Sequence, residues 1–338
     1  MRLAVLDVGS NAAHLHVVDA RPGGPPRSVF RLKAPTLLAD SVDDDGALSD
    51  DAVDRLVSAV TETVDASRRH AVIDLIPLAT ATIRDATNVE EIRARVRKAA
   101  GIELRSLSGE DEARVTFLAV RRWLGRAAGP VMLLDIGGAT TEIAAGAGET
   151  PGVAVSLPLG AARLTRTMLP CHPATARDVA AVHRHVLRTV RPHVARLRAA
   201  FGAEAASGPG ACAAAGPGAG VGAGPASGAG AAPTRRADGG GCRIATSKTF
   251  KQLSRVAGAD GRLTLDGLHD WIPRLAAMRP EQRAALPGVA ASRSRQILAG
   301  AIVAAATMEA LDITDVDVCP WALREGLLLR RITELSRS

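Results

Sequence analysis

Short apolar runs alternate with longer stretches of helical spacing along most of this chain. Apolar runs predict strands at 2–6, 15–18, 71–79, 102–107, 131–134, 142–145, 243–245 and 316–318. Apolar residues three and four positions apart, together with polar cap residues, predict helices at 50–68, 88–100, 108–124, 174–200, 265–277, 292–311 and 322–335. Strands that alternate with helices in this way indicate an α/β fold.

The pattern at the start of the chain returns once. Leu6–Ser10 (LDVGS) matches Leu134–Gly138 (LDIGG), and both segments follow an apolar run and end in a glycine turn. The two segments lie 128 residues apart, which indicates one internal duplication rather than a short-period repeat. We therefore predict two similar α/β domains, at 1–124 and 125–335, of which the second is richer in helix.

Residues 202–241 differ in composition from the rest of the chain. They are nearly all Gly, Ala, Pro and Ser, and they show no apolar periodicity. A segment of this kind has too little apolar surface to bury for a packed structure. We expect a flexible insertion without regular structure inside the second domain.

Composition and charge narrow the classes of function. The chain has 338 residues, 47% hydrophobic and 23% charged, which excludes a mostly disordered protein. Its net charge of +7 favours polyanionic partners, but an aromatic content of 2% leaves few stacking platforms, so we expect no nucleic acid. The longest apolar run, 297–308, is too short to span a bilayer. With no signal peptide and no Cys-x-x-Cys pair, we expect a cytoplasmic protein without membrane association.

The two glycine turns carry the clearest candidate chemistry. Glycine allows successive backbone N–H groups to approach an anion closely. The donors in the two turns are Ser10, Asn11, Gly137, Gly138, Thr140 and Thr141. Asp7 and Asp135, at the strand ends, would repel a phosphate unless a cation lay between them, and Mg²⁺ prefers carboxylate and phosphate oxygens. An ordinary hairpin turn explains either turn alone, but two matching turns favour phosphate binding.

Other polar residues allow two interpretations each. The acidic segment 108–114 begins a predicted helix, so its acids either stabilise the helix dipole or include one that activates water. Arg84 and Arg163 suit bidentate phosphate contacts, although surface arginines are common. Lys248 precedes a predicted helix and suits an anion at its N-terminus, but the upstream glycines of a P-loop are missing.

Taken in order, these segments resemble the exopolyphosphatase/guanosine pentaphosphate phosphatase family of the actin-like ATPase superfamily. The matching segments are 6–11, 79–86, 108–114, 135–142, 156–165, 245–250 and 319–326. The last two are similar to short, two-domain actinobacterial exopolyphosphatases. The resemblance implies two ribonuclease H-like domains with a cleft between them. It also implies a Mg²⁺- or Mn²⁺-dependent enzyme that releases terminal orthophosphate from inorganic polyphosphate, and a homodimer.

The resemblance also implies roles for individual residues. Glu112 falls on the catalytic base that deprotonates the attacking water, and Asp135 and Glu142 on the residues that position metal and water, with Asp7 sharing the metal. Arg84 and Arg163 would neutralise charge during transfer. The resemblance assigns phosphate binding to Ser10, Asn11, Gly137, Gly138, Thr140 and Thr141. Lys248 joins this set because of its place before a predicted helix, and not because of the resemblance.

Two departures from the family pattern affect the expected activity. Ala12 and Ala139 stand where relatives carry a small hydroxyl residue and a glycine. If residue 139 needs a positive φ, alanine costs on the order of 1 kcal/mol there. We expect activity, reduced or restricted to short chains. The alternatives are a guanosine pentaphosphate phosphohydrolase, a sugar-kinase-like phosphotransferase, and a polyphosphate or alarmone sensor without turnover.

Overall fold

The computed structural model describes residues 1–21, 26–38, 41–43, 45–125, 128–202, 241–259 and 261–337. The chain forms two compact units, unit 1 from 1–108 with 323–338 and unit 2 from 109–322. Apart from its two end residues, the expected insertion at 202–241 lies outside the described residues. Within the described ranges, no helix is both long enough and apolar enough to cross a membrane.

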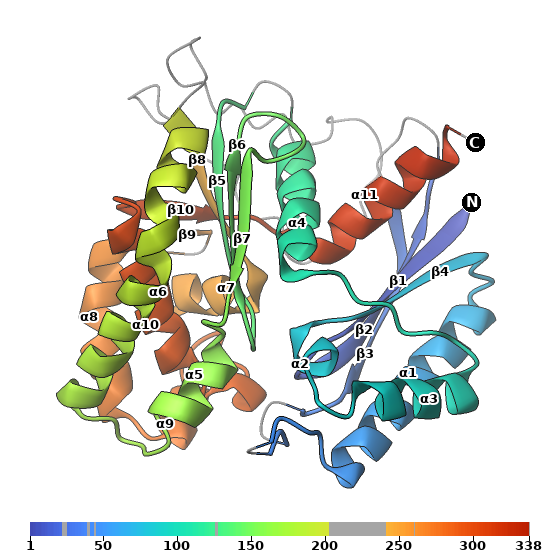
Figure 1. Cartoon of the computed structure of the whole chain (residues 1–338), viewed down its shortest axis with the longest axis horizontal. Helices are drawn as coiled ribbons and strands as arrows, with labels where there is room; N and C mark the ends of the chain where they lie inside the picture. Colours follow the sequence, from blue (N-terminus) through green and yellow to red (C-terminus); the bar gives the residue numbers. More distant parts are fainter. Residues whose placement is uncertain are drawn as a thin grey trace. The chain divides into compact units, whose positions relative to one another are not determined.

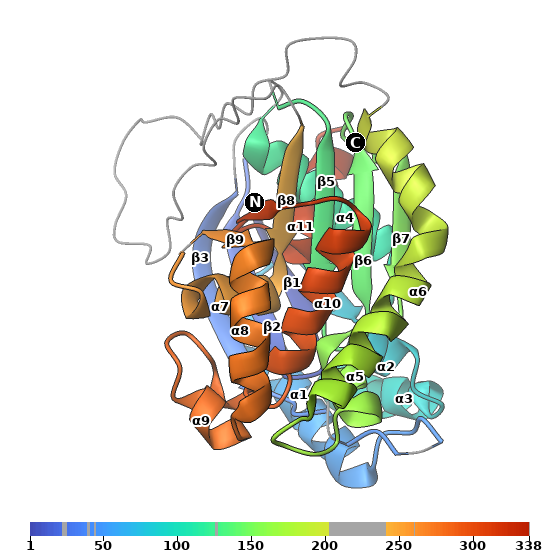
Figure 2. The same ribbon diagram turned by 90° about the vertical axis from the view of Figure 1, so that its left-hand side faces the viewer.

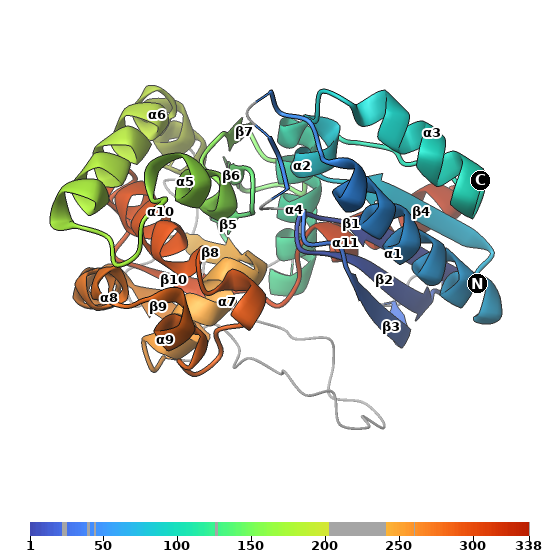
Figure 3. The same ribbon diagram turned by 90° about the horizontal axis from the view of Figure 1, so that it is seen from below.

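Unit 1 is built on a four-stranded sheet with the strand order β3-β2-β1-β4 (Figure 1). Its strands are β1 (Arg2–Val8), β2 (Ala12–Asp19), β3 (Arg27–Pro35) and β4 (Asp74–Ala79). Its helices are α1 (Asp50–Arg69), α2 (Ala81–Arg84), α3 (Val89–Ala100) and α11 (Leu323–Leu335). Helices α1 and α3 run side by side along one face of this sheet (Figure 3), and α11 lies on the other face (Figure 1).

Alternation along the strands explains which face of the unit 1 sheet is apolar. Ala4, Leu6 and Val8 of β1 point into the core that α1 covers. The apolar stripe of α1, from Val53 to Val64, is buried against this core, as its spacing predicts. Asn88, the residue before α3, bonds through its side chain to both backbone groups of Leu48 and does not cap the helix.

Unit 2 is built on a six-stranded sheet with the strand order β7-β6-β5-β8-β10-β9. Its strands are β5 (Val131–Ile136), β6 (Thr141–Gly146), β7 (Val153–Leu157), β8 (Cys242–Thr246), β9 (Arg262–Thr264) and β10 (Asp315–Val318). Its helices are α4 (Gly109–Leu124), α5 (Ala161–Met168), α6 (Ala176–Gly202), α7 (Ser247–Val256), α8 (Leu265–Ala277), α9 (Pro280–Ala284), the 3₁₀ turn η2 (Ala291–Arg293) and α10 (Ile297–Ala310). Figure 2 shows α6 and α10 on one face of the sheet and α4 on the other.

The long apolar run of the sequence is a core helix. Every residue from Ile297 to Met308 in α10 is buried, and the helix packs against α6 and α8. A helix that is apolar on all sides belongs in a protein core or a membrane, and twelve residues are too few for a membrane. Gly300 allows the close approach to α7, since a Cβ there would lie 2.6 Å from Thr249 Cγ2.

The internal duplication is visible in the hydrogen bonds. The hairpin of β1 and β2 pairs Asp7 with His14, and the hairpin of β5 and β6 pairs Asp135 with Glu142. Both turns close on the same bond: Gly9 N donates to Ala12 O (3.1 Å) and Gly137 N donates to Thr140 O (2.9 Å). The repeated segment therefore forms the same hairpin in each unit, as the duplication predicts.

The two units do not coincide with the predicted domains. Helix α4 belongs to unit 2 because Phe117 and Val120 pack in one cluster with Leu133 of β5. Helix α11 belongs to unit 1, where it packs on β1 and Arg331 Nε lies 2.6 Å from Asp74 Oδ2. The spacing of apolar residues predicts these two helices, but it does not predict whether a helix packs in the core of unit 1 or of unit 2.

Several predicted elements differ in the structure. Segment 102–107 is not a strand, because only an isolated bridge joins Leu78 to Arg105. The predicted helix 292–311 divides into η2 and α10, whereas α6 runs unbroken through Pro192 and agrees with the predicted helix 174–200. Strands β3 and β7 were not predicted from their sequences.

A buried histidine in unit 1 makes stability depend on pH. Burial, followed by the charge of Arg31, lowers the pKa of His16 to about 4, although Glu325 Oε1 lies 3.8 Å from His16 Nδ1. Between its ordinary value of 6.5 and about 4, the unfolded chain binds a proton that the folded chain does not. The free energy of unfolding must therefore fall as the pH is lowered through this window.

We expect His16→Gln to remove this pH dependence. Between pH 7 and pH 4 the wild type should lose roughly 2–3 kcal/mol more stability than the variant, since one pKa unit corresponds to about 1.4 kcal/mol. Urea unfolding of both proteins at a series of pH values measures the difference. Parallel curves for the two proteins would contradict the assignment to His16.

Candidate active site

Four polar side chains form one row across the sheet of unit 2. Ser156 on β7 is the register partner of Glu142 on β6, which is the partner of Asp135 on β5, which is the partner of Thr246 on β8. Register partners lie on the same face of a sheet. This is the face that α4 covers, since Ala144, two residues from Glu142, packs in the α4 cluster. We call these four residues the polar row.

The carboxylate of Glu142 is held from one side of the polar row. Ser156 Oγ donates a hydrogen bond of 2.8 Å to Glu142 Oε1. Glu142 is only 5% exposed, so this donor stabilises a carboxylate that has lost most of its hydration. The bond fixes the orientation of Glu142 beside Asp135.

The other end of the polar row carries hydroxyls without a protein partner. Thr246 is fully buried, and among the described residues its Oγ1 has no hydrogen-bond partner. The same holds for Oγ of Ser247, which also has a φ of 82°, unusual for a residue other than glycine. Lys248 follows, exposed, in the first turn of α7. Unsatisfied hydroxyls and backbone strain concentrate at ligand sites.

Helix α4 brings one acid to the same face. Of the acids in its first turn, Glu110 and Asp111 are exposed and lie 3.4 and 3.5 Å from Arg114, whereas Glu112 is buried, at 7% exposure. The helix begins at Gly109, which lies directly against Ser156. Glu112 is therefore the acid of this first turn that faces inward, on the helix whose first residue packs against Ser156 of the polar row.

The turn after β5 is held by the N-terminus of α5. Its carbonyls accept bonds of 2.9–3.1 Å from the amides of residues 160–163, and Arg163 Nε also donates to Ala139 O (3.1 Å). The amides of Gly138 and Ala139 donate to no acceptor in the part of the chain that the structure describes. With the carbonyls turned toward α5, these amides suit an anion.

The structure bears on two expectations for this turn. Thr141 is fully buried and its hydroxyl donates to Leu159 O (2.9 Å), so the hydroxyl stabilises the turn, and its contact with a phosphate stays a prediction. Ala139 is not among the residues with a positive φ, so the condition for backbone strain at this position is not met.

The remaining predicted site residues lie in unit 1. Asp7 is the second-last residue of β1, where burial raises the pKa of its carboxyl and Arg324, 3.9 Å away, opposes the shift. In the following turn Asn11 Nδ2 donates to Ser10 Oγ (3.1 Å). Arg84 Nε lies 2.8 Å from Asp85 Oδ1, and its Nη1 donates to Leu107 O. The loop of unit 1 therefore repeats the geometry of unit 2 but not its row of acids.

A comparison with known families identifies the kind of protein. The sequence model of the Ppx/GppA phosphatase family matches residues 16–213 and 230–335. The chain belongs to the Ppx/GppA phosphatase family. Proteins named "Exopolyphosphatase 1" from Mycobacterium tuberculosis and Mycobacterium leprae are 41% and 40% identical to it, over 98% of this chain and 88% and 90% of their own lengths.

Solved structures agree on the fold of this Ppx/GppA member. The crystal structure of an exopolyphosphatase from Cytophaga hutchinsonii matches 99% of this chain and 98% of its own, with a TM-score of 0.79 and 18% identity. This likeness concerns the fold alone. The predicted fold class, α/β with two sheet-based units, is confirmed.

The sequence analysis of this Ppx/GppA member did not predict three residues of the candidate site. Ser156 and Thr246 join the polar row only through strand register, although both stand in segments that match the family. Burial lowers the pKa of Arg293 in η2, and Asp135 opposes the shift, which places this guanidinium in the field of the polar row. No local sequence pattern points to Arg293.

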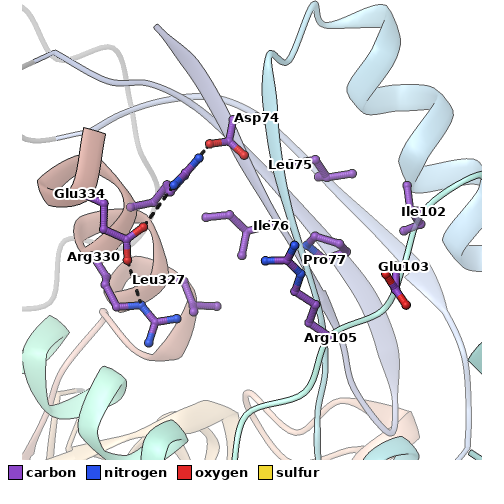
Figure 4. A pocket seen from close by; sticks show the side chains of 11 residues that line it. Asp74, Leu75, Ile76, Pro77, Ile102, Glu103, Arg105, Leu327, Arg330 and Glu334 are labelled. Atoms are coloured by element: carbon purple, nitrogen blue, oxygen red, sulfur yellow. Dashed lines mark hydrogen bonds and ion pairs between the residues drawn. The ribbon is translucent and has the colours of Figure 1, made fainter. Parts of the chain in front are cut away.

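A cavity of about 470 Å³ lies in unit 1 (Figure 4). It is bounded by β4, by residues 102–105 and by α11. Arg331 bridges Asp74 and Glu334 at its edge, with distances of 2.6 and 3.2 Å. Because none of the predicted site residues lines it, we assign no part of the reaction to this cavity.

Proposed function

We propose that this chain is an exopolyphosphatase that releases terminal orthophosphate from short-chain inorganic polyphosphate. One observation carries the proposal: Asp135 and Glu142 lie on the face of unit 2's sheet that is covered by α4, the helix of the buried Glu112, and the turn after β5 has amides that suit a phosphate. Membership of a phosphatase family and the names of the two mycobacterial relatives support the choice of substrate.

The residues fit a divalent cation of the magnesium type. Among the described residues, no group of three or more His, Cys, Asp or Glu side chains lies close enough to hold a metal ion alone. Mg²⁺ does not need such a group, because it commonly uses one or two carboxylates and completes its shell with phosphate and water. Asp135 and Glu142 are neighbours in the polar row, and the unpartnered hydroxyl of Thr246 is next to Asp135. We propose that Mg²⁺ or Mn²⁺ binds there.

The chain's own residues supply the proton transfer and the positioning. We propose that Glu112 accepts a proton from the attacking water as the water oxygen bonds to the terminal phosphorus. The anhydride bond then breaks, and the polymer leaves one phosphate shorter. The amides of Gly138 and Ala139 hold oxygens of the terminal phosphate, and Arg163 braces their turn through Ala139 O. A bound cation supplies charge neutralisation on the phosphate oxygens.

The residues of unit 1 are proposed as phosphate ligands. Ser10 and Asn11 stand in a turn with the same closing bond as the turn of unit 2, which supports this role. Arg84 and Lys248 remain proposed phosphate contacts as well. The role of Asp7 as a further ligand of the cation stays a prediction, since Arg324 already provides its carboxylate with a counter-charge at 3.9 Å.

A substrate comparison tests this proposal. Orthophosphate release should be faster from short-chain polyphosphate than from guanosine pentaphosphate, and no phosphate should pass from ATP to a small alcohol. Added salt should raise KM, because the chain carries a net charge of +7 and polyphosphate is a polyanion. Faster release from guanosine pentaphosphate would overturn the substrate, and tight binding without turnover would indicate a sensor.

The assembly and the location stay predictions. We expect a homodimer in the cytoplasm, and light scattering of the purified protein measures the mass in solution. A mass of 34.9 kDa, that of one chain, would contradict the dimer.

A further inference from the structure

We propose that Ser156 is a positioning residue that keeps Glu142 and the start of α4 in one fixed arrangement. Its hydroxyl holds the carboxylate, and its side chain supports the helix that carries Glu112. The inference rests on the proposed function in one respect, namely that Glu112 and Glu142 both act in hydrolysis.

The first contact is the hydrogen bond to Glu142. Ser156 Oγ lies 2.8 Å from Glu142 Oε1, and the two residues are register partners on neighbouring strands. Regular strand pairing therefore sets the direction of the donor. Losing this donor removes one of the contacts that fix the last torsion angle of this buried carboxylate.

The second contact is with the backbone of Gly109. A Cβ at residue 109 would lie 2.3 Å from Ser156 Oγ and 2.4 Å from Ser156 Cβ, so the first residue of α4 packs directly on this serine. Glu112 follows three residues later and lies on the same side of the helix. The position of Glu112 thus depends on the same side chain that orients Glu142.

Removing only the hydroxyl separates the two contacts. We expect Ser156→Ala to keep the Cβ that packs on Gly109 and to lose the bond to Glu142. The kcat for orthophosphate release should fall 10- to 100-fold with KM within about twofold. Mn²⁺ binding to the substrate-free protein, measured by electron paramagnetic resonance, should weaken by a similar factor, since partners of metal ligands commonly affect metal affinity that much.

A matched control shows whether removing a serine hydroxyl elsewhere in unit 2 has the same effect. Ser254 in α7 is buried, and among the described residues its hydroxyl donates to the helix carbonyl of Lys251 (3.2 Å). Ser254→Ala should leave kcat, KM and Mn²⁺ affinity within twofold. If Ser156→Ala and Ser254→Ala behave the same, Ser156 has no special role and the proposal is wrong.

A paired substitution tests the packing contact. Gly109→Ala alone should lower the melting temperature and the activity, because its methyl group overlaps Ser156. In Gly109→Ala with Ser156→Gly, the melting temperature should return to that of Ser156→Gly alone. The kcat of the double variant should stay low, because the donor to Glu142 is missing. A fully active, stable Gly109→Ala would overturn the packing part.

The results also distinguish this inference from the proposed function. If wild type releases orthophosphate and Ser156→Ala matches it in kcat, KM and Mn²⁺ affinity, the inference fails while the function stands. If wild type shows no turnover on any polyphosphate, the function fails. The Mn²⁺ titration then still decides whether Ser156 orients Glu142, since it requires no turnover.

Discussion

Replacing Glu112 with glutamine is expected to slow orthophosphate release from short-chain polyphosphate by about 10²–10⁴-fold, the usual contribution of a general base. Glutamine has nearly the same shape but cannot accept the proton of the attacking water. Because the buried Glu112 is replaced by a side chain of nearly the same size, the fold and the binding of substrate should change little. Phosphate release under saturating substrate, together with polyphosphate binding by titration, measures both effects.

Glu110→Gln is the matched control on the same helix. Glu110 is exposed, lies two residues earlier and pairs with Arg114 at 3.4 Å. Exposed ion pairs of this kind contribute little to stability, so the free energy of unfolding should change little and the rate of orthophosphate release should stay within twofold of the wild type. Equal losses in Glu110→Gln and Glu112→Gln would mean that charge at the start of α4, and not a base, is what the reaction needs.

Gly160→Ala is expected to disrupt the phosphate-binding turn. A Cβ at residue 160 would lie 2.2 Å from the carbonyl carbon of Ala139 and 2.3 Å from Gly138 O, both backbone atoms. Neither atom can move without breaking the bonds that α5 donates into the turn. We expect a loss of about 3 kcal/mol in the free energy of unfolding and a loss of about 10²-fold in activity from the displaced turn.

Gly148→Ala provides the reference for a tolerated glycine replacement. Residue 148 is exposed between β6 and β7, and a Cβ there would meet nothing closer than Thr150 O at 3.5 Å. This variant should unfold within about 0.5 kcal/mol of the wild type, as surface substitutions commonly do. If Gly160→Ala is as stable and as active as Gly148→Ala, the turn is not held as the structure indicates.

Strand alternation and the repeated turn made much of unit 2's site predictable. Asp135 was found because its segment repeats that of Asp7, and the hairpins share their register. The same alternation also excludes Thr141 as a partner of Glu142, because neighbouring residues on a strand point to opposite faces. Thr141 faces the side of Leu159, to which it donates, and a strict reading of the strand would have predicted this.

Long-range packing accounts for what the sequence did not reveal. Ser156 enters the site because β7 pairs with β6, and nothing in residues 153–157 states that partner. Helix α11 was predicted correctly as a helix, but its place in unit 1 depends on contacts with β1 and Asp74, more than 240 residues away in sequence. Contacts at such separations are set by the whole fold, so local patterns do not encode them.

The most direct test of the whole account is a titration of metal-stripped protein with Mg²⁺, with orthophosphate release from short-chain polyphosphate as the readout. The account predicts no release after chelation, full recovery on adding Mg²⁺, and a much weaker response to Mg²⁺ in Asp135→Asn. Release that persists in the stripped protein, or an unchanged Mg²⁺ response in Asp135→Asn, would contradict the placing of the cation and the reaction at the polar row.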